Sequence, residues 1–345
     1  MTTESDEVLT RVDGRVGFIT LNRPRAINSL THSMVTAMDA VLQAWADDDT
    51  VDAVVVTGAG ERGLCAGGDV VALYHSARAG GAQARAFFFD EYRLNARIGS
   101  YPKPYVAVMD GIVMGGGVGI SGHGSVRVAT ETCKIAMPEV GIGFIPDVGG
   151  TYLLSRAPGG LGLHAALTGA PFGAGDAIAM GFADHHVPHA DLEAFIAALA
   201  ADGVQAALAA FSREAPPSLL TAQRDWIDPC YAGESLADVM TALRDHGEGP
   251  AADAADLIAT RSPVACAVTL AAVRRAATMK SLEDVLVQEY RVSCASLRSH
   301  DFVEGIRAQL VDKDRNPQWS PSSIAEVTDD DVAQYFTSAD PDLTF

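Results

Sequence analysis

The stretch GIVMGGGVGISGHGSVRVATETCKIAMPEVGIGFIPDVGGT, residues 111–151, determines how we interpret the rest of the chain. It follows an apolar run at 105–109 that predicts a buried strand. Three glycines at 115–117 come next, and a ligand can approach a backbone that lacks side chains. If a helix begins there, its first N–H groups have no internal partner and can bind a developing oxyanion. Close packing of helix on strand explains the glycines equally well.

Two carboxylates follow in the same stretch. Glu139 is expected at the end of a short strand over 134–137, and Asp147 precedes a helix predicted over 151–156. The apolar residues around them are Val140, Ile142, Phe144 and Ile145. Desolvation beside a like charge raises a carboxylate pKa toward working pH, which suits acid–base catalysis. The alternatives are a helix N-cap for Asp147 and a solvated strand end for Glu139.

A third acid is predicted to face inward from a helix over residues 85–98. Glu91 falls in the apolar stripe of this helix, whereas Asp90 does not. The stripe consists of Phe87, Glu91, Leu94 and Ile98. An inward carboxylate is costly unless it is paired or used, so Glu91 is a candidate site residue. Pairing with a nearby arginine or backbone donor is the alternative.

Two loops near the N-terminus offer binding groups. A strand over 15–21 leads into a loop with Arg23 and Arg25, which are either solvated charges or phosphate contacts. Asn28 or Ser29 is expected to cap the following helix.

A second buried strand, over 51–57, leads to a glycine-rich turn at 58–69 that opens another helix. That turn could supply the second backbone donor that an oxyanion hole needs.

Composition excludes several classes of protein. The chain has 345 residues, of which 48% are hydrophobic, so it can bury a sizeable core. The net charge of −19 argues against nucleic-acid and membrane-surface partners, because polyanions would be repelled. The N-terminal residues lack a basic lead and an apolar run, and no segment approaches the ~20 apolar residues of a membrane span.

Cysteine and histidine spacing adds two expectations. Five cysteines without a C-x-x-C pair fit a reduced, cytoplasmic location. His185 and His186 are predicted in an edge strand and lack a third ligand at metal spacing, so no metal site is expected.

Strands interspersed with helices indicate an α/β fold. We expect a strand-and-helix core over residues 1–210 and a helical C-terminal extension over 211–345, with a joint at Pro216-Pro217.

Four segments, 15–30, 64–69, 111–119 and 137–152, resemble the signatures of the crotonase, or enoyl-CoA hydratase/isomerase, superfamily. Six motifs resemble its acyl-CoA thioester hydrolases: AGGD at 66–69, FFFDEYRLN at 87–95, MGGGVGISGHG at 114–124, AMPEVGIGFIPDVGG at 136–150, EYR at 289–291 and DFVEGIRAQLVDKDRNPQW at 301–319. The resemblance covers nearly the whole chain. It implies a crotonase-like ββα-spiral core and hydrolysis of a 3-hydroxyacyl-CoA thioester in valine breakdown.

The resemblance also implies roles for individual residues. The backbone N–H groups of Cys65 and Gly116 would form the oxyanion hole. Glu91, Gly116, Glu139 and Asp147 occupy substrate-contact positions. Glu139 would act as a nucleophile or as a general base, and these alternatives stay open. Asp147 and Glu91 would bind the substrate's 3-hydroxyl or relay protons.

The same resemblance places Arg25 and Ala26 in the loop that touches the CoA nucleotide. The first catalytic glutamate of the hydratases falls at Gly119 here, so hydratase activity should be weak or absent. No metal or redox cofactor is expected, since CoA is part of the substrate. Relatives in the superfamily commonly form trimers or hexamers.

Two other functions remain. An enoyl- or dienoyl-CoA isomerase or hydratase of the same fold could use Glu139 and Asp147 to move a proton. A non-catalytic acyl-CoA-binding protein would keep the glycine turns while the acids lose their roles.

Overall fold

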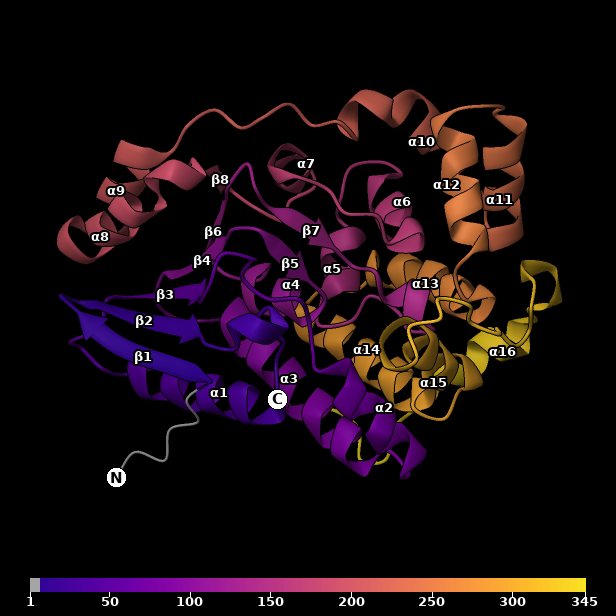
Figure 1. Cartoon of the computed structure of the whole chain (residues 1–345), viewed down its shortest axis with the longest axis horizontal. Coiled ribbons are helices and arrows are strands. Elements are labelled where there is room, and N and C mark those ends of the chain that lie inside the picture. Colours follow the sequence, from indigo (N-terminus) through magenta and orange to yellow (C-terminus); the bar gives the residue numbers. More distant parts are fainter. Residues whose placement is uncertain (1–6) are drawn as a thin grey trace. The chain divides into compact units, whose positions relative to one another are not determined.

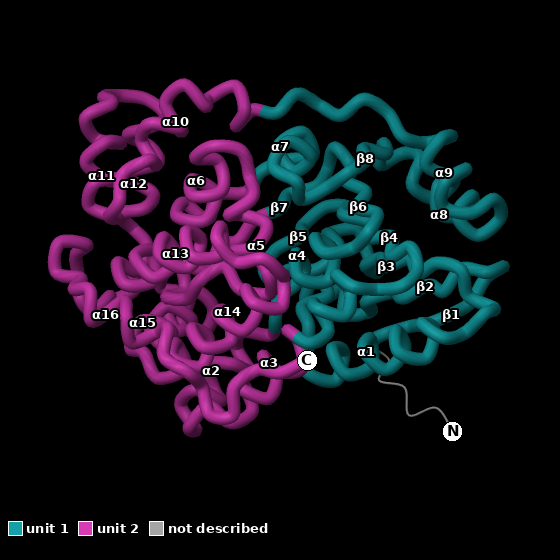
Figure 2. The backbone as a smooth tube through the Cα atoms, turned by 180° about the vertical axis from the view of Figure 1, so that it is seen from behind, with its two compact units in different colours: residues 1–68, 93–135, 172–218 teal, residues 69–92, 136–171, 219–345 magenta. Residues whose placement is uncertain are grey.

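The computed structural model describes residues 7–345 (Figure 1) and contains two compact units (Figure 2). Of the described residues, unit 1 comprises 7–68, 93–135 and 172–218, and unit 2 comprises 69–92, 136–171 and 219–345. This division differs from the expected boundary near residue 210. Unit 2 takes two segments from the N-terminal part of the chain because these segments pack on C-terminal helices: α2 contacts α15, and α5 and α6 contact α13.

Unit 1 is built on a six-stranded sheet with the order β1-β2-β3-β4-β6-β8. Its strands are β1 (Val8–Asp13), β2 (Val16–Leu21), β3 (Ala53–Gly58), β4 (Tyr105–Met109), β6 (Val126–Ala129) and β8 (His185–His186). Only β1 is antiparallel to its neighbour; the other pairs are parallel. A second, two-stranded sheet pairs β5 (Ile112–Met114) with β7 (Lys134–Ala136). The parallel-rich sheet with its helices confirms the α/β class.

Helices also belong to unit 1. They are α1 (His32–Ala46), α4 (Gly116–Ser121), α7 (Ala174–Ala179), α8 (Leu192–Asp202) and α9 (Val204–Phe211). Alternate residues of β2, β3, β4 and β6 form one core with Phe195 and Leu199 of α8 and Leu208 of α9. Residues two apart in a strand share a face, so one face of the sheet carries this core.

The helix after β2 is not capped as expected. Thr31, not Asn28 or Ser29, is the N-cap of α1, and its hydroxyl accepts the Met34 N–H at 3.2 Å. Asn28 is buried in a left-handed conformation, and its amide donates to the carbonyl oxygens of Ala59 and Gly63. Asn28 therefore fastens the loop to the neighbouring glycine-rich turn.

Unit 2 is helical. Its helices are α2 (Val70–Arg78), α5 (Gly150–Leu154), α6 (Leu161–Thr168), α10 (Arg224–Cys230), α11 (Leu236–Asp245), α12 (Pro250–Ala259), α13 (Pro263–Ala276), α14 (Leu282–Ser296), α15 (His300–Ile306) and α16 (Asp329–Ala333). The long helix α3 (Ala82–Gly99) belongs to unit 2 as far as Tyr92 and to unit 1 beyond it. Side chains of α13 and α14 form a core with Ile145 and Tyr335.

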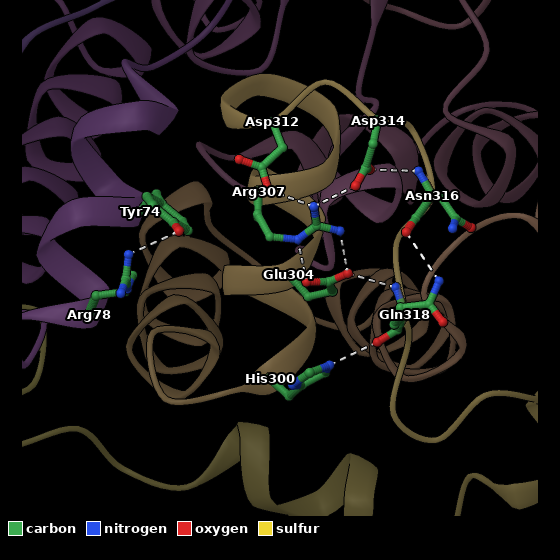
Figure 3. Close-up of polar contacts among 9 residues, drawn as sticks. All are labelled: Tyr74, Arg78, His300, Glu304, Arg307, Asp312, Asp314, Asn316 and Gln318. Atoms are coloured by element: carbon green, nitrogen blue, oxygen red, sulfur yellow. Dashed lines mark hydrogen bonds and ion pairs between the residues drawn. The ribbon is translucent and has the colours of Figure 1, made fainter.

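A charged network organises the segment after α15 (Figure 3). Arg307 begins a π-helical turn, Arg307–Val311, and pairs with Glu304 at 2.8 Å, Asp312 at 2.8 Å and Asp314 at 2.6 Å. Glu304 also accepts the backbone N–H of Gln318. These contacts close the loop over 312–318 onto α15, so the charges of this motif have a structural role.

No single helix in the described part of the chain is long and apolar enough to cross a membrane. The two helices α12 and α13, which are bent by 115° at the break between them, reach that length and apolar composition only when taken together.

Candidate active site

Glu139 lies in a short helical turn of unit 2. The strand β7 ends at Ala136, and Glu139 begins the 3₁₀ turn Glu139–Ile142. Pro138 has no N–H to extend the strand ladder. Glu139 is 7% exposed, so the alternative of a solvated strand end is wrong.

Asp147 is not a helix cap. The N-cap of α5 is Gly149, and no side chain caps this helix. Instead, Asp147 is 6% exposed and its Oδ2 accepts the Tyr92 hydroxyl at 2.6 Å. The same hydroxyl lies 2.6 Å from Ser293 Oγ on α14. The N-cap alternative is therefore wrong. Tyr92 holds the side chain of Asp147 in place through this hydrogen bond.

Glu91 faces inward from α3, as its place in the apolar stripe predicts, and is 2% exposed. Burial raises its pKa well above the usual value, and the charges of Asp147 and Glu139 raise it further. Burial likewise raises the pKa of Glu139, with Asp147 adding to the effect. For Asp147, burial raises the pKa to about 7, although the Tyr92 hydrogen bond opposes the shift. The three carboxyl groups thus share one desolvated cluster within unit 2.

Two oxygens of this cluster have no hydrogen-bond partner among the described residues: Glu91 Oε1 and Glu139 Oε2. Buried polar atoms are normally satisfied, and an unpaired one costs free energy. Glu91 Oε1 therefore lacks the arginine or backbone partner that the alternative for this residue requires. Both oxygens are free to bind a donor on a ligand.

A fourth buried acid was assigned no role from the sequence. Glu289 of α14 is 0% exposed and accepts the N–H groups of Gly149 and Thr151 and the Thr151 hydroxyl. Burial raises its pKa to about 8, even though these hydrogen bonds lower it. The sequence carried a signal, because Glu289 lies in the inward stripe of α14 with Val285, Leu286 and Val292.

The glycine turns of unit 1 lie against each other. A Cβ on Gly117 would approach Cys65 O at 2.4 Å, so packing alone requires a glycine there. A Cβ on Gly67 would lie 3.8 Å from Gly116 N, which begins α4. The expected helix start is confirmed, and the packing explanation holds for Gly117.

The structure corrects the expectation for Cys65. Its N–H donates to Ile112 O at 3.1 Å, so an oxyanion would compete with that acceptor. Among the described residues, hydrogen bonds leave the N–H groups of Gly68 and Gly116 unoccupied. We therefore take Gly68 and Gly116 as the candidate donors.

The two arginines of the loop after β2 have different surroundings. Arg23 pairs with Glu7 at 3.1 Å and donates to Ser29 O at 2.6 Å, so it holds the loop in shape. Arg25 is exposed in the 3₁₀ turn Pro24–Ala26, and its guanidinium makes no hydrogen bond or ion pair with another described residue. Arg25, with Ala26 beside it, is the better candidate for a phosphate.

His186 has a structural partner. His186 lies in the short edge strand β8, as expected, and its Nδ1 lies 3.0 Å from Glu214 O. In residues 7–345, no group of three or more His, Cys, Asp or Glu side chains could hold a metal ion.

Comparison with known proteins shows similarity along nearly the whole chain. The family model for enoyl-CoA hydratase/isomerase matches residues 16–336. A Danio rerio protein named "3-hydroxyisobutyryl-CoA hydrolase, mitochondrial" is 40% identical, with 97% of this chain and 90% of the relative covered. The Homo sapiens protein of the same name is 38% identical, with 100% and 92% covered.

Two solved structures are also similar. One, described as a carnitinyl-CoA dehydratase from Mycobacterium thermoresistibile, is 68% identical with a TM-score of 0.97, and 99% of each chain is covered. The other, described as an enoyl-CoA hydratase from Rhodobacter sphaeroides 2.4.1, is 43% identical with a TM-score of 0.93, and 98% of this chain and 100% of the other are covered. These superpositions confirm the expected fold, whereas the similar proteins are described with different reactions.

Proposed function

The chain belongs to the enoyl-CoA hydratase/isomerase family, and from that premise we propose that it hydrolyses 3-hydroxyisobutyryl-CoA to 3-hydroxyisobutyrate and free CoA in valine breakdown. The observation that carries the proposal is the buried cluster of Glu91, Glu139 and Asp147, with its two unpaired carboxylate oxygens. Hydrolase relatives that are 38–40% identical over nearly the full chain support this reaction.

Thioester hydrolysis divides the work between two kinds of group. Backbone N–H donors would stabilise the negative charge that develops on the carbonyl oxygen, and Gly68 and Gly116 are our candidates. Glu139 would attack the carbonyl carbon and release CoA thiolate, leaving an anhydride that water then hydrolyses, or it would take a proton from an attacking water. Glu91 and Asp147 would bind the 3-hydroxyl, which selects for substrates that carry one.

The structures described as a dehydratase and a hydratase support a second candidate, the addition of water to an enoyl-CoA or its removal. By the superfamily's pattern, this chemistry lacks one acid here, because Gly119 stands at the position of the first hydratase glutamate. The absence of that glutamate favours hydrolysis.

One assay separates the candidates. The parent enzyme is incubated with 3-hydroxyisobutyryl-CoA and free thiol is followed with a thiol reagent, while hydration of crotonyl-CoA is followed by loss of enoyl absorbance. Thiol release without hydration is the expected result. Hydration without thiol release would establish the hydratase, and binding of both esters without turnover would indicate a non-catalytic acyl-CoA-binding protein.

Gly119→Glu is expected to create measurable hydration of crotonyl-CoA. Gly119 lies in α4 without a positive φ, so its backbone accepts a side chain. The new carboxylate would restore the missing partner of Glu139. Gly119→Gln is the matched control, since it fills the same space without a base. Equal hydration by the Glu and Gln variants would contradict the alignment at Gly119.

Arg25→Ala is expected to raise KM for the CoA ester several-fold and leave kcat nearly unchanged, because a phosphate contact is equal in the ground and transition states. The KM of the variant should also depend less on salt. Arg11→Ala removes an equal charge from exposed β1 and is the control. A similar rise in KM in both variants would show a general field effect and remove Arg25 from the binding site.

Three expectations from the sequence remain part of the proposal. No metal or redox cofactor is required, the protein is cytoplasmic, and it assembles as a trimer or hexamer.

A further inference from the structure

The loop that carries Asp147 is fastened to α14 by one carboxylate. Glu289 Oε2 accepts the Gly149 N–H at 2.6 Å, and Oε1 accepts the Thr151 N–H at 2.9 Å and the Thr151 hydroxyl at 2.6 Å. All three donors lie within four residues of Asp147. A carboxylate that accepts several donors fixes their relative positions, since each bond is directional.

The loop adopts a conformation that needs such a restraint. Val148 has a φ of 54° and Gly149 a φ of 76°, so two successive residues are left-handed. A β-branched residue rarely takes this conformation and persists there only when its surroundings enforce it. The strained residue, Val148, lies between Asp147 and Gly149, which is the first donor to Glu289.

The same helix also reaches the side chain of Asp147. Ser293 follows Glu289 by four residues, which places both on one face of α14. Its hydroxyl lies 2.6 Å from the Tyr92 hydroxyl, and Tyr92 donates to Asp147 Oδ2 at 2.6 Å. One face of α14 therefore controls the backbone after Asp147 through Glu289 and its carboxylate through Ser293 and Tyr92.

We propose that Glu289 is a positioning residue that sets the geometry of Asp147 for the reaction. The link to catalysis rests on the proposed thioester hydrolysis, whereas the clamp on residues 147–151 does not depend on which ester is the substrate. A purely stabilising role explains the arrangement less well. Burying an acid at 0% exposure is costly, and Glu289 adds a fourth carboxyl group to a cluster that already holds three.

Glu289→Gln tests the clamp with little change in shape. A glutamine has one acceptor oxygen, so its NH₂ group must face either the Gly149 N–H or the Thr151 donors and one bond is lost. Thr151→Val is a milder variant that removes only the hydroxyl bond, and Thr151→Ser retains it. Gln288→Met is the matched control, because Gln288 is also buried on α14 but donates to Ala272 O on α13.

Amide hydrogen exchange tests, without any substrate, whether Glu289 restrains residues 147–151. In Glu289→Gln the amide that loses its acceptor, Gly149 or Thr151, should exchange at least tenfold faster than in the parent, whereas Gln288→Met should leave both amides unchanged. Equal acceleration in both variants would reduce Glu289 to a general stabilising residue and overturn the proposal. Because this measurement needs no turnover, it still decides on the clamp if the parent fails to hydrolyse 3-hydroxyisobutyryl-CoA.

Measurements of kcat and KM test whether Glu289 positions Asp147 for the reaction. Per folded enzyme, Glu289→Gln should lower kcat about 10- to 100-fold with KM nearly constant, since small displacements of a reacting group cost that much. Thr151→Val should lose less than about tenfold, with Thr151→Ser near the parent, and Gln288→Met should keep the parental kcat at a temperature where all are folded. A parental kcat in Glu289→Gln, with one amide deprotected, would show that the clamp exists but does not serve catalysis, and would overturn the positioning role. If Glu289→Gln does not fold, the Thr151 pair decides: equal kcat for Val and Ser would count against the proposal.

Discussion

Replacing Glu139 with Gln is expected to lower kcat on 3-hydroxyisobutyryl-CoA by about 10²–10⁴-fold or more. General acid–base catalysis alone contributes a factor of that size, and loss of a covalent nucleophile costs at least as much. The amide keeps the shape of the side chain but can neither attack the carbonyl nor take a proton from water. Binding of the CoA ester, measured by calorimetry, should persist.

The control for this variant is its stability. Burial and the charge of Asp147 raise the pKa of Glu139, so ionising it in the folded protein is unfavourable. A neutral Gln should therefore fold at least as well as the parent at neutral pH. Near-parental turnover by a folded Glu139→Gln would show that Glu139 is only a buried structural carboxyl group.

A labelling experiment then separates the two roles of Glu139. In a single turnover in ¹⁸O water, the anhydride route places the label on Glu139 when water attacks the glutamyl carbonyl. The general-base route places the label only in the released acid. Mass spectrometry of the peptide that contains Glu139 reads the difference.

The parts of the site that the sequence predicted depend on local periodicity. Glu91 was found because it interrupts an apolar stripe of α3, and the helix start at Gly116 because three glycines follow a buried strand. Such patterns report which way a side chain faces, whatever the rest of the fold does. The desolvated setting of Glu139 and Asp147 followed from their apolar neighbours in the same way.

The parts that could not be predicted depend on contacts between distant segments. Glu289 and Gly149 are 140 residues apart, and Tyr92 and Asp147 are 55 apart. Without the Tyr92 bond, an aspartate just ahead of a helix fits an N-cap as well as a catalytic role. The sequence also does not show whether a backbone N–H is free to bind a ligand, since the hydrogen bond from Cys65 N–H to Ile112 O forms only in the folded chain.

The division into units has the same cause. Segments 69–92 and 136–171 precede the expected boundary in sequence but pack with the C-terminal helices. Composition changes along the chain mark where helices become frequent, whereas packing decides which helices share a core. The candidate acids Glu91, Glu139 and Asp147 consequently belong to the unit that contains α14.

Replacing Asp147 with Asn is expected to lower kcat by about 10²-fold or more if its charge assists proton transfer, with a further loss of preference for substrates that carry a 3-hydroxyl. The Asn oxygen can still accept the Tyr92 hydroxyl, so the geometry of the site should survive. Comparing kcat/KM for 3-hydroxyisobutyryl-CoA and isobutyryl-CoA measures the preference. An unchanged ratio would remove Asp147 from hydroxyl binding.

The pH dependence of stability tests the environment of Asp147 independently of activity. Its folded-state pKa is about 7, above the ordinary value near 4 that applies in the unfolded chain. The folded state therefore holds more protons between these values, and the contribution of Asp147 to stability is present at low pH and lost as pH rises through about 7. Asp147→Asn lacks this loss, so its melting temperature relative to the parent should increase from pH 4 to pH 7 and level off above. A constant difference would mean that Asp147 titrates normally.

The same variant should move the acid limb of the pH–rate profile. Glu139 must be ionised to act as nucleophile or base, and the negative charge of Asp147 raises its pKa. Removing that charge lowers the Glu139 pKa, even though Glu289 and Glu91 remain in the cluster. The residual activity of Asp147→Asn should therefore persist to lower pH than that of the parent. A shift of the acid limb to higher pH would mean that Asp147 is protonated during turnover and stabilises the Glu139 carboxylate by donating a hydrogen bond to it.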